Sequence, residues 1–213
     1  MRVLSCLILG IFLPFATLVQ AQDTTPPPAG LPTVAPLPAP REIAPSVAAD
    51  VSTPAERLDT LFEQLRREPD AAKAGEISTL IQAQWLQSGS ATIDLLMSRA
   101  AEAAAKKETA AALDLLDQTI VLSPGYAEGW NRRATVNYSE NRYDLSMADV
   151  EETLRREPRH FAALTGLATM QEELGQRRRA LATYLRVLAI YPALKEAQDA
   201  ALRLSDELAG ERA

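Results

Sequence analysis

Three prolines recur at equal spacing in this 213-residue chain, at positions 124, 158 and 192. Proline lacks a backbone N–H and clashes with the preceding helical turn, so each of the three predicts the end of a helix. Self-similarity at a fixed period of about 20 to 50 residues is typical of stacked repeats. One helix pair cannot bury its apolar face alone, so about three stacked pairs are needed to complete a core. The spacing therefore predicts an all-α solenoid of antiparallel helix pairs.

Residue size follows the same interval. Two antiparallel helices approach closely only where one of them carries a small side chain, and a large neighbour then fills the space beside it. The chain has few aromatic residues, 5%, which suits close-packed helices better than sheets. The matched positions are Leu96, Trp130 and Leu164; Ala100, Ala134 and Ala168; Ala112, Ser146 and Ala180; and Asn141 with Gly175 in a turn.

The middle interval closely resembles the tetratricopeptide repeat (TPR). The resemblance covers three units over 93–194, and we assign the repeats to 91–192. It implies stacked helix pairs whose first helices line a concave face, where members of this family commonly hold an extended peptide or a helix of a partner. The residues that carry it are Trp130 and Ala134 in the run AEGWNRRA, then Tyr138, Asn141, Tyr143, Ser146 and the closing Arg156-Glu157-Pro158.

The first 21 residues have the pattern of a secretory signal peptide. A charged start precedes an apolar run, and Val19-Gln20-Ala21 matches a small-residue cleavage site. The run is short for a membrane span, which needs about 20 apolar residues, and it contains Pro14. We expect cleavage and export to the bacterial periplasm, with a retained anchor as the alternative. Cys6, the only cysteine, lies near the beginning of the run, so we predict neither a lipid-acceptor site nor a disulfide framework.

Residues 22–53 are rich in Pro and Ala, and we interpret them as an extended linker. A passive spacer is favoured, and a Pro-rich ligand for a groove is the alternative. Residues 54–90 predict a degenerate helix pair that caps the solenoid, since a terminal unit must face water on one side. Residues 193–213 predict a last amphipathic helix over the third repeat, with a frayed tail. The apolar stripes are Leu58, Leu61, Phe62 and Leu65; Ile77, Leu80, Ile81 and Trp85; and Leu194, Ala197, Ala201, Leu204 and Leu208.

The residue inventory excludes most catalytic chemistry. His160 is the only histidine, and the cleaved chain would have no cysteine, so Cys–His nucleophiles and His/Cys metal clusters are ruled out. A serine triad would have to use His160, which we place in an exposed turn after Pro158. We therefore expect no enzyme activity, no metal and no cofactor. The net charge of −6 also argues against a nucleic-acid surface, which needs a basic balance.

Two arginines occupy a repeat position where the family usually has leucine. Arg99 and Arg133 stand there, and an unpaired buried guanidinium would be prohibitive, so each needs a partner. Asp149 lies on the facing helix, and some tetratricopeptide sequences carry a similar Arg–Asp pair. We expect an Arg133–Asp149 ion pair that fixes helix register. For Arg99 the candidate partners are Asp114 and Asp117.

The resemblance also implies where a ligand would lie. The departures from the chaperone-binding members are Met97 and Ala101, which replace the clamp lysine and asparagine, so we do not expect a chaperone-tail clamp. In the second repeat an amide, a guanidinium and a tyrosine could bind a peptide backbone, a carboxylate and an apolar surface. A merely solvated helix surface is the alternative. The expected groove comprises Met97, Asn131, Arg132, Thr135, Tyr138, Thr165, Thr169 and Glu172, with Asp94, Ser98 and Ala101 beside them.

Taken together, the sequence predicts an exported, non-enzymatic scaffold or adaptor. It would bind another protein, such as a cell-envelope enzyme or assembly component, in the concave groove. Two alternatives stay open: self-association or a spacer role within an envelope complex, and an enzyme with a carboxylate-only site.

Overall fold

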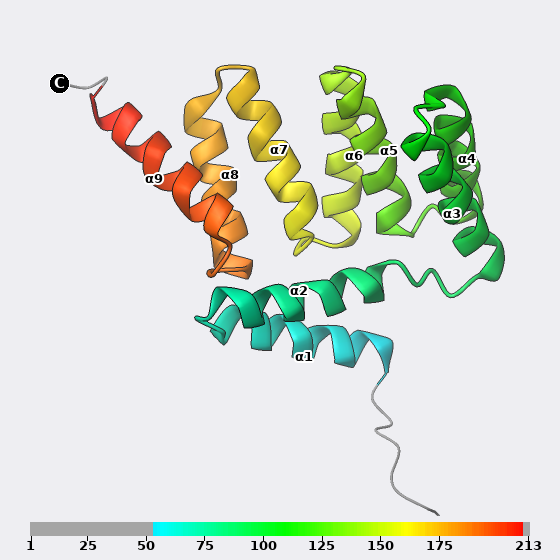
Figure 1. Cartoon of the computed structure of the whole chain (residues 1–213), viewed down its shortest axis with the longest axis horizontal. Coiled ribbons are helices and arrows are strands. Elements are labelled where there is room, and N and C mark those ends of the chain that lie inside the picture. The colour runs from blue at the N-terminus through cyan, green and yellow to red at the C-terminus, as the bar shows by residue number, and fades with distance from the viewer. Residues whose placement is uncertain (1–52, 211–213) are drawn as a thin grey trace, which may run out of the picture. The chain divides into compact units, whose positions relative to one another are not determined.

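The computed structural model describes residues 53–210 (Figure 1). The predicted signal peptide and nearly all of the predicted linker lie outside these residues. Within the described range all regular structure is helical, as predicted. The helices are α1 (Pro54–Arg67), α2 (Ala71–Trp85), α3 (Ala91–Ala105), α4 (Thr109–Leu122), α5 (Ala127–Ser139), α6 (Tyr143–Arg156), α7 (Phe161–Glu173), α8 (Arg177–Ile190) and α9 (Lys195–Gly210).

Helices α3 to α8 form the three predicted antiparallel hairpins, stacked side by side (Figure 1). The second helices end at Leu122, Arg156 and Ile190, which keeps the interval of the three prolines. The small residues expected at the close contacts, Ala112, Ala134, Ala168 and Ala180, are all buried. Within the described residues no helix is both long and apolar enough to cross a membrane.

The turn inside each hairpin uses one left-handed residue at the same repeat position. Lys107, Asn141 and Gly175 have φ of 61°, 57° and 70°. Each turn closes on a hydrogen bond from the next residue's N–H back to a carbonyl of the first helix, as in a Schellman motif. Asn and Gly tolerate this conformation, whereas Lys107 is strained in it.

The N-terminal hairpin of α1 and α2 lies across the helix ends that carry the inter-repeat turns (Figure 1). Its buried residues, among them Phe62, Leu65 and Trp85, share a core with α7, α8 and α9. None of them belongs to the core of α3 and α4. The predicted helix pair is therefore present, but it packs against α7, α8 and α9 rather than onto the outer face of α3.

The outer face of α3 explains why the hairpin does not stack there. In the second and third repeats Val136 and Met170 are buried against the preceding repeat. The equivalent residue of the first repeat is Glu102, which pairs with Arg99 at 3.1 Å on the surface. Covering this face would bury an ion pair at a net cost, so the first repeat ends the stack with a water-facing side.

The predicted apolar stripe of α2 is also divided between two environments. Ile81 and Trp85 are buried in the core shared with α7 to α9, whereas Leu80 is 55% exposed. At the other end of the chain α9 packs against α8, with Ala197, Ala201, Leu204 and Leu208 buried.

Candidate partner-binding face

The predicted groove residues of the second and third repeats all lie on α5 and α7. We call Asn131, Arg132, Thr135, Tyr138, Thr165, Thr169 and Glu172 the binding face. Thr135 is exposed and Arg132 keeps 46% of its side chain exposed, while the others are half-buried. Met97 does not belong with them: it is 8% exposed and packs in the α3–α4 core beside Val136. Its expected place in the groove was wrong, because the neighbouring repeat covers it.

A buried carboxylate organises the polar end of the binding face. Glu128, 5% exposed, lies in the first turn of α5, one helical turn before Asn131 and Arg132. Its Oε1 accepts from Arg132 Nε at 2.6 Å, and its Oε2 accepts from Asn131 Nδ2 at 3.0 Å. Within residues 53–210 the Arg132 guanidinium binds only through Nε, so its Nη atoms remain available to a ligand.

His160 completes this cluster and was mispredicted as an exposed turn residue. It is 1% exposed and its Nε2 lies 3.0 Å from Glu128 Oε2. Its Nδ1 accepts from the N–H of Ala163 at 3.1 Å and so caps α7. Because Nδ1 accepts, the proton is on Nε2 and is donated to Glu128. The ring stacks on Trp85 with centroids 4.0 Å apart, so the hairpin is what buries it.

Burial and charge act in opposite directions on Glu128. Burial alone raises the pKa of this carboxyl. The hydrogen bonds from His160 and Arg132, with the positive charge of Arg132, outweigh burial, so the pKa of Glu128 lies below its ordinary value. Glu128 is therefore an anion at neutral pH, and its charge holds Arg132 in one orientation.

The rest of the binding face offers hydroxyl groups. Thr135, Thr165 and Thr169 donate to the carbonyls four residues earlier at 3.0, 2.9 and 3.1 Å. Their oxygens can still accept a hydrogen bond and their methyl groups give small apolar contacts. These groups are therefore better suited to binding a polypeptide backbone than to catalysing a reaction.

Two side-chain bonds tie the binding face to its neighbours. Tyr138 Oη donates to Glu173 Oε1 at 2.7 Å across α5 and α7, which raises the pKa of Tyr138 to about 12. Glu172 accepts from Arg203 of α9. These contacts hold α5, α7 and α9 in register.

Within the described residues no group of three His, Cys, Asp or Glu is placed to hold a metal ion.

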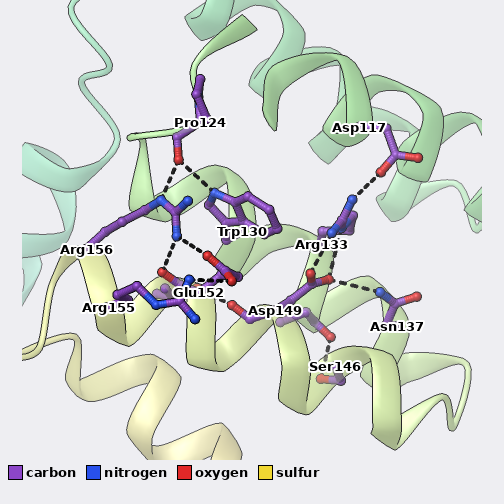
Figure 2. A network of polar contacts seen from close by, with 12 residues as sticks. Asp117, Pro124, Trp130, Arg133, Asn137, Ser146, Asp149, Glu152, Arg155 and Arg156 are labelled. Atoms are coloured by element: carbon purple, nitrogen blue, oxygen red, sulfur yellow. Dashed lines mark hydrogen bonds and ion pairs between the residues drawn. The ribbon is translucent and has the colours of Figure 1, made fainter. Parts of the chain in front are cut away.

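The expected Arg133–Asp149 pair is present at the centre of Figure 2. Arg133 donates to Asp149 through Nη2 at 2.6 Å and through Nε at 3.0 Å. Asn137 Nδ2 adds a third bond to Asp149 at 3.2 Å. The hydrogen bond to Asp149 is the main cause that raises the pKa of Arg133 and keeps it charged.

The same network extends to the first repeat and to the inter-repeat turn. Arg133 Nη1 donates to Asp117 of α4 at 2.6 Å, which links two repeats (Figure 2). Asp117 was a candidate partner for Arg99, but Arg99 pairs with Glu102 instead, so neither predicted partner was right. Trp130 packs against the guanidiniums of Arg133 and Arg156, at 5.1 and 4.6 Å from its ring centroid.

Sequence reasoning missed Glu128 and misplaced His160, and it did not foresee the contact of Trp85 with His160. The spacing of Glu128 from Asn131 and Arg132, three and four positions along one helix, is a local signal for a shared helix face. No local signal connects His160 to Glu128 or to Trp85, because both lie far from it in the sequence.

Comparison with known proteins identifies the family. No family model matches the sequence. A TPR repeat-containing protein of Rhizobium etli is 48% identical over 161 residues, which cover 76% of this chain and 79% of that protein. The chain is a tetratricopeptide repeat protein.

Solved structures at low identity share the fold of this TPR protein. The first TPR domain of Spaghetti (RPAP3), bound to the HSP90 peptide SRMEEVD, has a TM-score of 0.52 at 17% identity, over 55% of this chain and 94% of that one. The TPR2B domain of yeast Sti1, in a complex with pHsp70, has a TM-score of 0.51 at 18% identity, over 55% and 99%. MamA has a TM-score of 0.50 at 12% identity, over 72% and 81%.

Proposed function

We propose that this TPR protein is a non-enzymatic adaptor of the cell envelope that holds a segment of another protein on the binding face. The observation that carries the proposal is Arg132, whose Nε is fixed by the buried Glu128 while its Nη atoms remain available. A guanidinium held in one orientation loses little entropy when it binds a carboxylate with two parallel hydrogen bonds.

The proposed ligand is an extended segment that carries a carboxylate near its centre or at its end. The carboxylate would bind Arg132, and the backbone would lie along Thr135 of α5 and Thr165 and Thr169 of α7. The Spaghetti and Sti1 domains are bound to an HSP90 peptide and to pHsp70, which supports a peptide ligand for this fold. Chaperone tails are not proposed, because Met97 and Ala101 replace the clamp residues and Met97 is buried.

The proposed location is the bacterial periplasm, on the strength of the signal-peptide pattern of residues 1–21. The partner would then be an envelope enzyme or assembly component.

Capture from an envelope extract tests the proposal. The wild-type chain is the bait, and Arg132→Ala is compared with Arg155→Ala as a matched control. Arg155 is a surface arginine whose side chain is 67% exposed and pairs with Glu152, away from the binding face. We expect Arg132→Ala to lower recovery of the partner at least about tenfold, because it removes both charge-assisted hydrogen bonds to the carboxylate, and Arg155→Ala to leave recovery unchanged. Equal recovery by all three folded baits would exclude the binding face.

A further inference from the structure

The C-terminal half of α2 exposes an apolar side that has no charged residue. Leu80 and Leu86 are 55% and 46% exposed there, with Ala83 exposed between them. Charged residues make up 23% of the chain, yet residues 77–93 contain none. Depletion of charge at an exposed apolar surface is what distinguishes the centre of a protein–protein interface.

The same side of the hairpin is hollowed. A cavity of about 520 Å³ lies between α1 and α2. Arg57, Thr60 and Leu61 of α1 line one wall, and Leu80, Ala83 and Gln84 of α2, with Gln87 just after it, line the other. Leu61 also packs against the core shared with α7 to α9, but no residue of α5 or α7 is part of the cavity lining. The cavity is therefore separate from the binding face.

We propose that this surface binds the same surface of a second copy of the chain, so that the protein is a two-fold symmetric dimer. Charge is compatible with this occupant. Each chain carries a net charge of −6, so two copies repel unless the contact surfaces are themselves neutral. Residues 77–93 satisfy that condition.

The residue pattern of α2 is also self-complementary under two-fold symmetry. In an antiparallel crossing centred on Ala83, Leu80 of one copy faces Leu86 of the other, because the two lie at equal distances on either side. Ala83 at the centre lets the backbones approach closely. Leu86 still has helical φ and ψ of −71° and −13°, so it continues the same face. The charged Glu76 and Lys73 lie about two and three helical turns before Ala83, toward the N-terminal end of α2.

Sedimentation of the full chain tests the dimer. We expect a species of twice the 23.1 kDa chain mass, and Leu80→Glu should raise its dissociation constant about a hundredfold or more by placing two unpaired carboxylates at the contact. Leu185→Glu is the matched control, since Leu185 is 54% exposed on α8. It should dimerise like the wild type, and circular dichroism should show all three chains equally helical. If the wild type stays monomeric, the proposal is refuted. This holds whether the surface of α2 is then covered by residues 22–52 or by another protein. Dimerisation of Leu80→Glu as tight as that of the wild type would refute it too.

Disulfide trapping tests the geometry independently. In a Cys6→Ser background, Ala83→Cys should form a covalent dimer on mild oxidation, because the two Cα atoms meet at the symmetry axis within disulfide range. Leu185→Cys in the same background should remain uncrosslinked. Failure of Ala83→Cys to crosslink would exclude a crossing centred there. Neither experiment involves Arg132, so failure here leaves the proposed binding face untouched.

Discussion

Replacing Asp149 by Ala tests how much the buried ion pair stabilises the second repeat. Asp149 is 4% exposed and accepts three hydrogen bonds, at 2.6 and 3.0 Å from Arg133 and at 3.2 Å from Asn137. The substitution leaves the amide of Asn137, itself 4% exposed, without this acceptor. It also leaves a positive charge that is largely buried, since the Arg133 side chain is 24% exposed.

The expected loss is about 3 kcal/mol in the free energy of unfolding. Breaking a buried pair costs about 3–5 kcal/mol, and a buried amide without its partner costs about 1–3 kcal/mol. The lower end applies because Arg133 keeps Asp117 and some contact with water. Asp117→Ala removes the other carboxylate of the same guanidinium, but Asp117 is 57% exposed, so the expected loss is below about 1 kcal/mol.

Urea denaturation followed by circular dichroism measures both losses, and Arg133→Ala with the double variant closes a double-mutant cycle. We expect a coupling energy of about 2 kcal/mol between Arg133 and Asp149. The reasoning fails if Asp149→Ala changes the free energy of unfolding by less than about 0.5 kcal/mol, as an ordinary surface substitution would. It also fails if Asp149→Ala is no more harmful than Asp117→Ala. Either result would mean that the pair exists without stabilising the repeat.

Two further predictions follow from the turns and the buried carboxylate. Lys107→Gly should stabilise the chain by about 0.5–1 kcal/mol, because a left-handed Lys costs about 1–2 kcal/mol and the greater chain entropy of Gly returns part of that gain. Gly175→Ala, the reverse change at the matched turn, should be destabilising, and a Lys107→Gly chain with a lower urea midpoint would contradict this account. The folded-state pKa of Glu128 is below its unfolded value, so its contribution is complete above about pH 4.5 and is lost as the pH falls through the folded pKa. The difference in the free energy of unfolding between wild type and Glu128→Gln should therefore be constant near neutral pH and decrease in acid. A difference that increases on acidification would be incompatible with a lowered pKa.

Features that repeat along the chain could be predicted, because short-range rules determine them. Pro124, Pro158 and Pro192 end helices by losing a donor and by steric clash, wherever the rest of the protein lies. Ala134 and its equivalents are small because the partner helix is next in sequence. The Arg133–Asp149 pair could be predicted for the same reason, since both residues belong to one hairpin.

The position of the N-terminal hairpin could not be predicted, and the misplacement of His160 and Leu80 follows from it. An apolar stripe shows that a helix needs a cover but does not say which of several surfaces supplies it. The choice depended on Glu102 and Arg99, whose ion pair makes the outer face of α3 costly to bury. The sequence by itself determined the repeat, its turns and its pairing of helices, all through contacts close in the chain. Only the tertiary structure decided that Trp85 covers His160, because that contact joins two segments separated by two whole repeats of the chain.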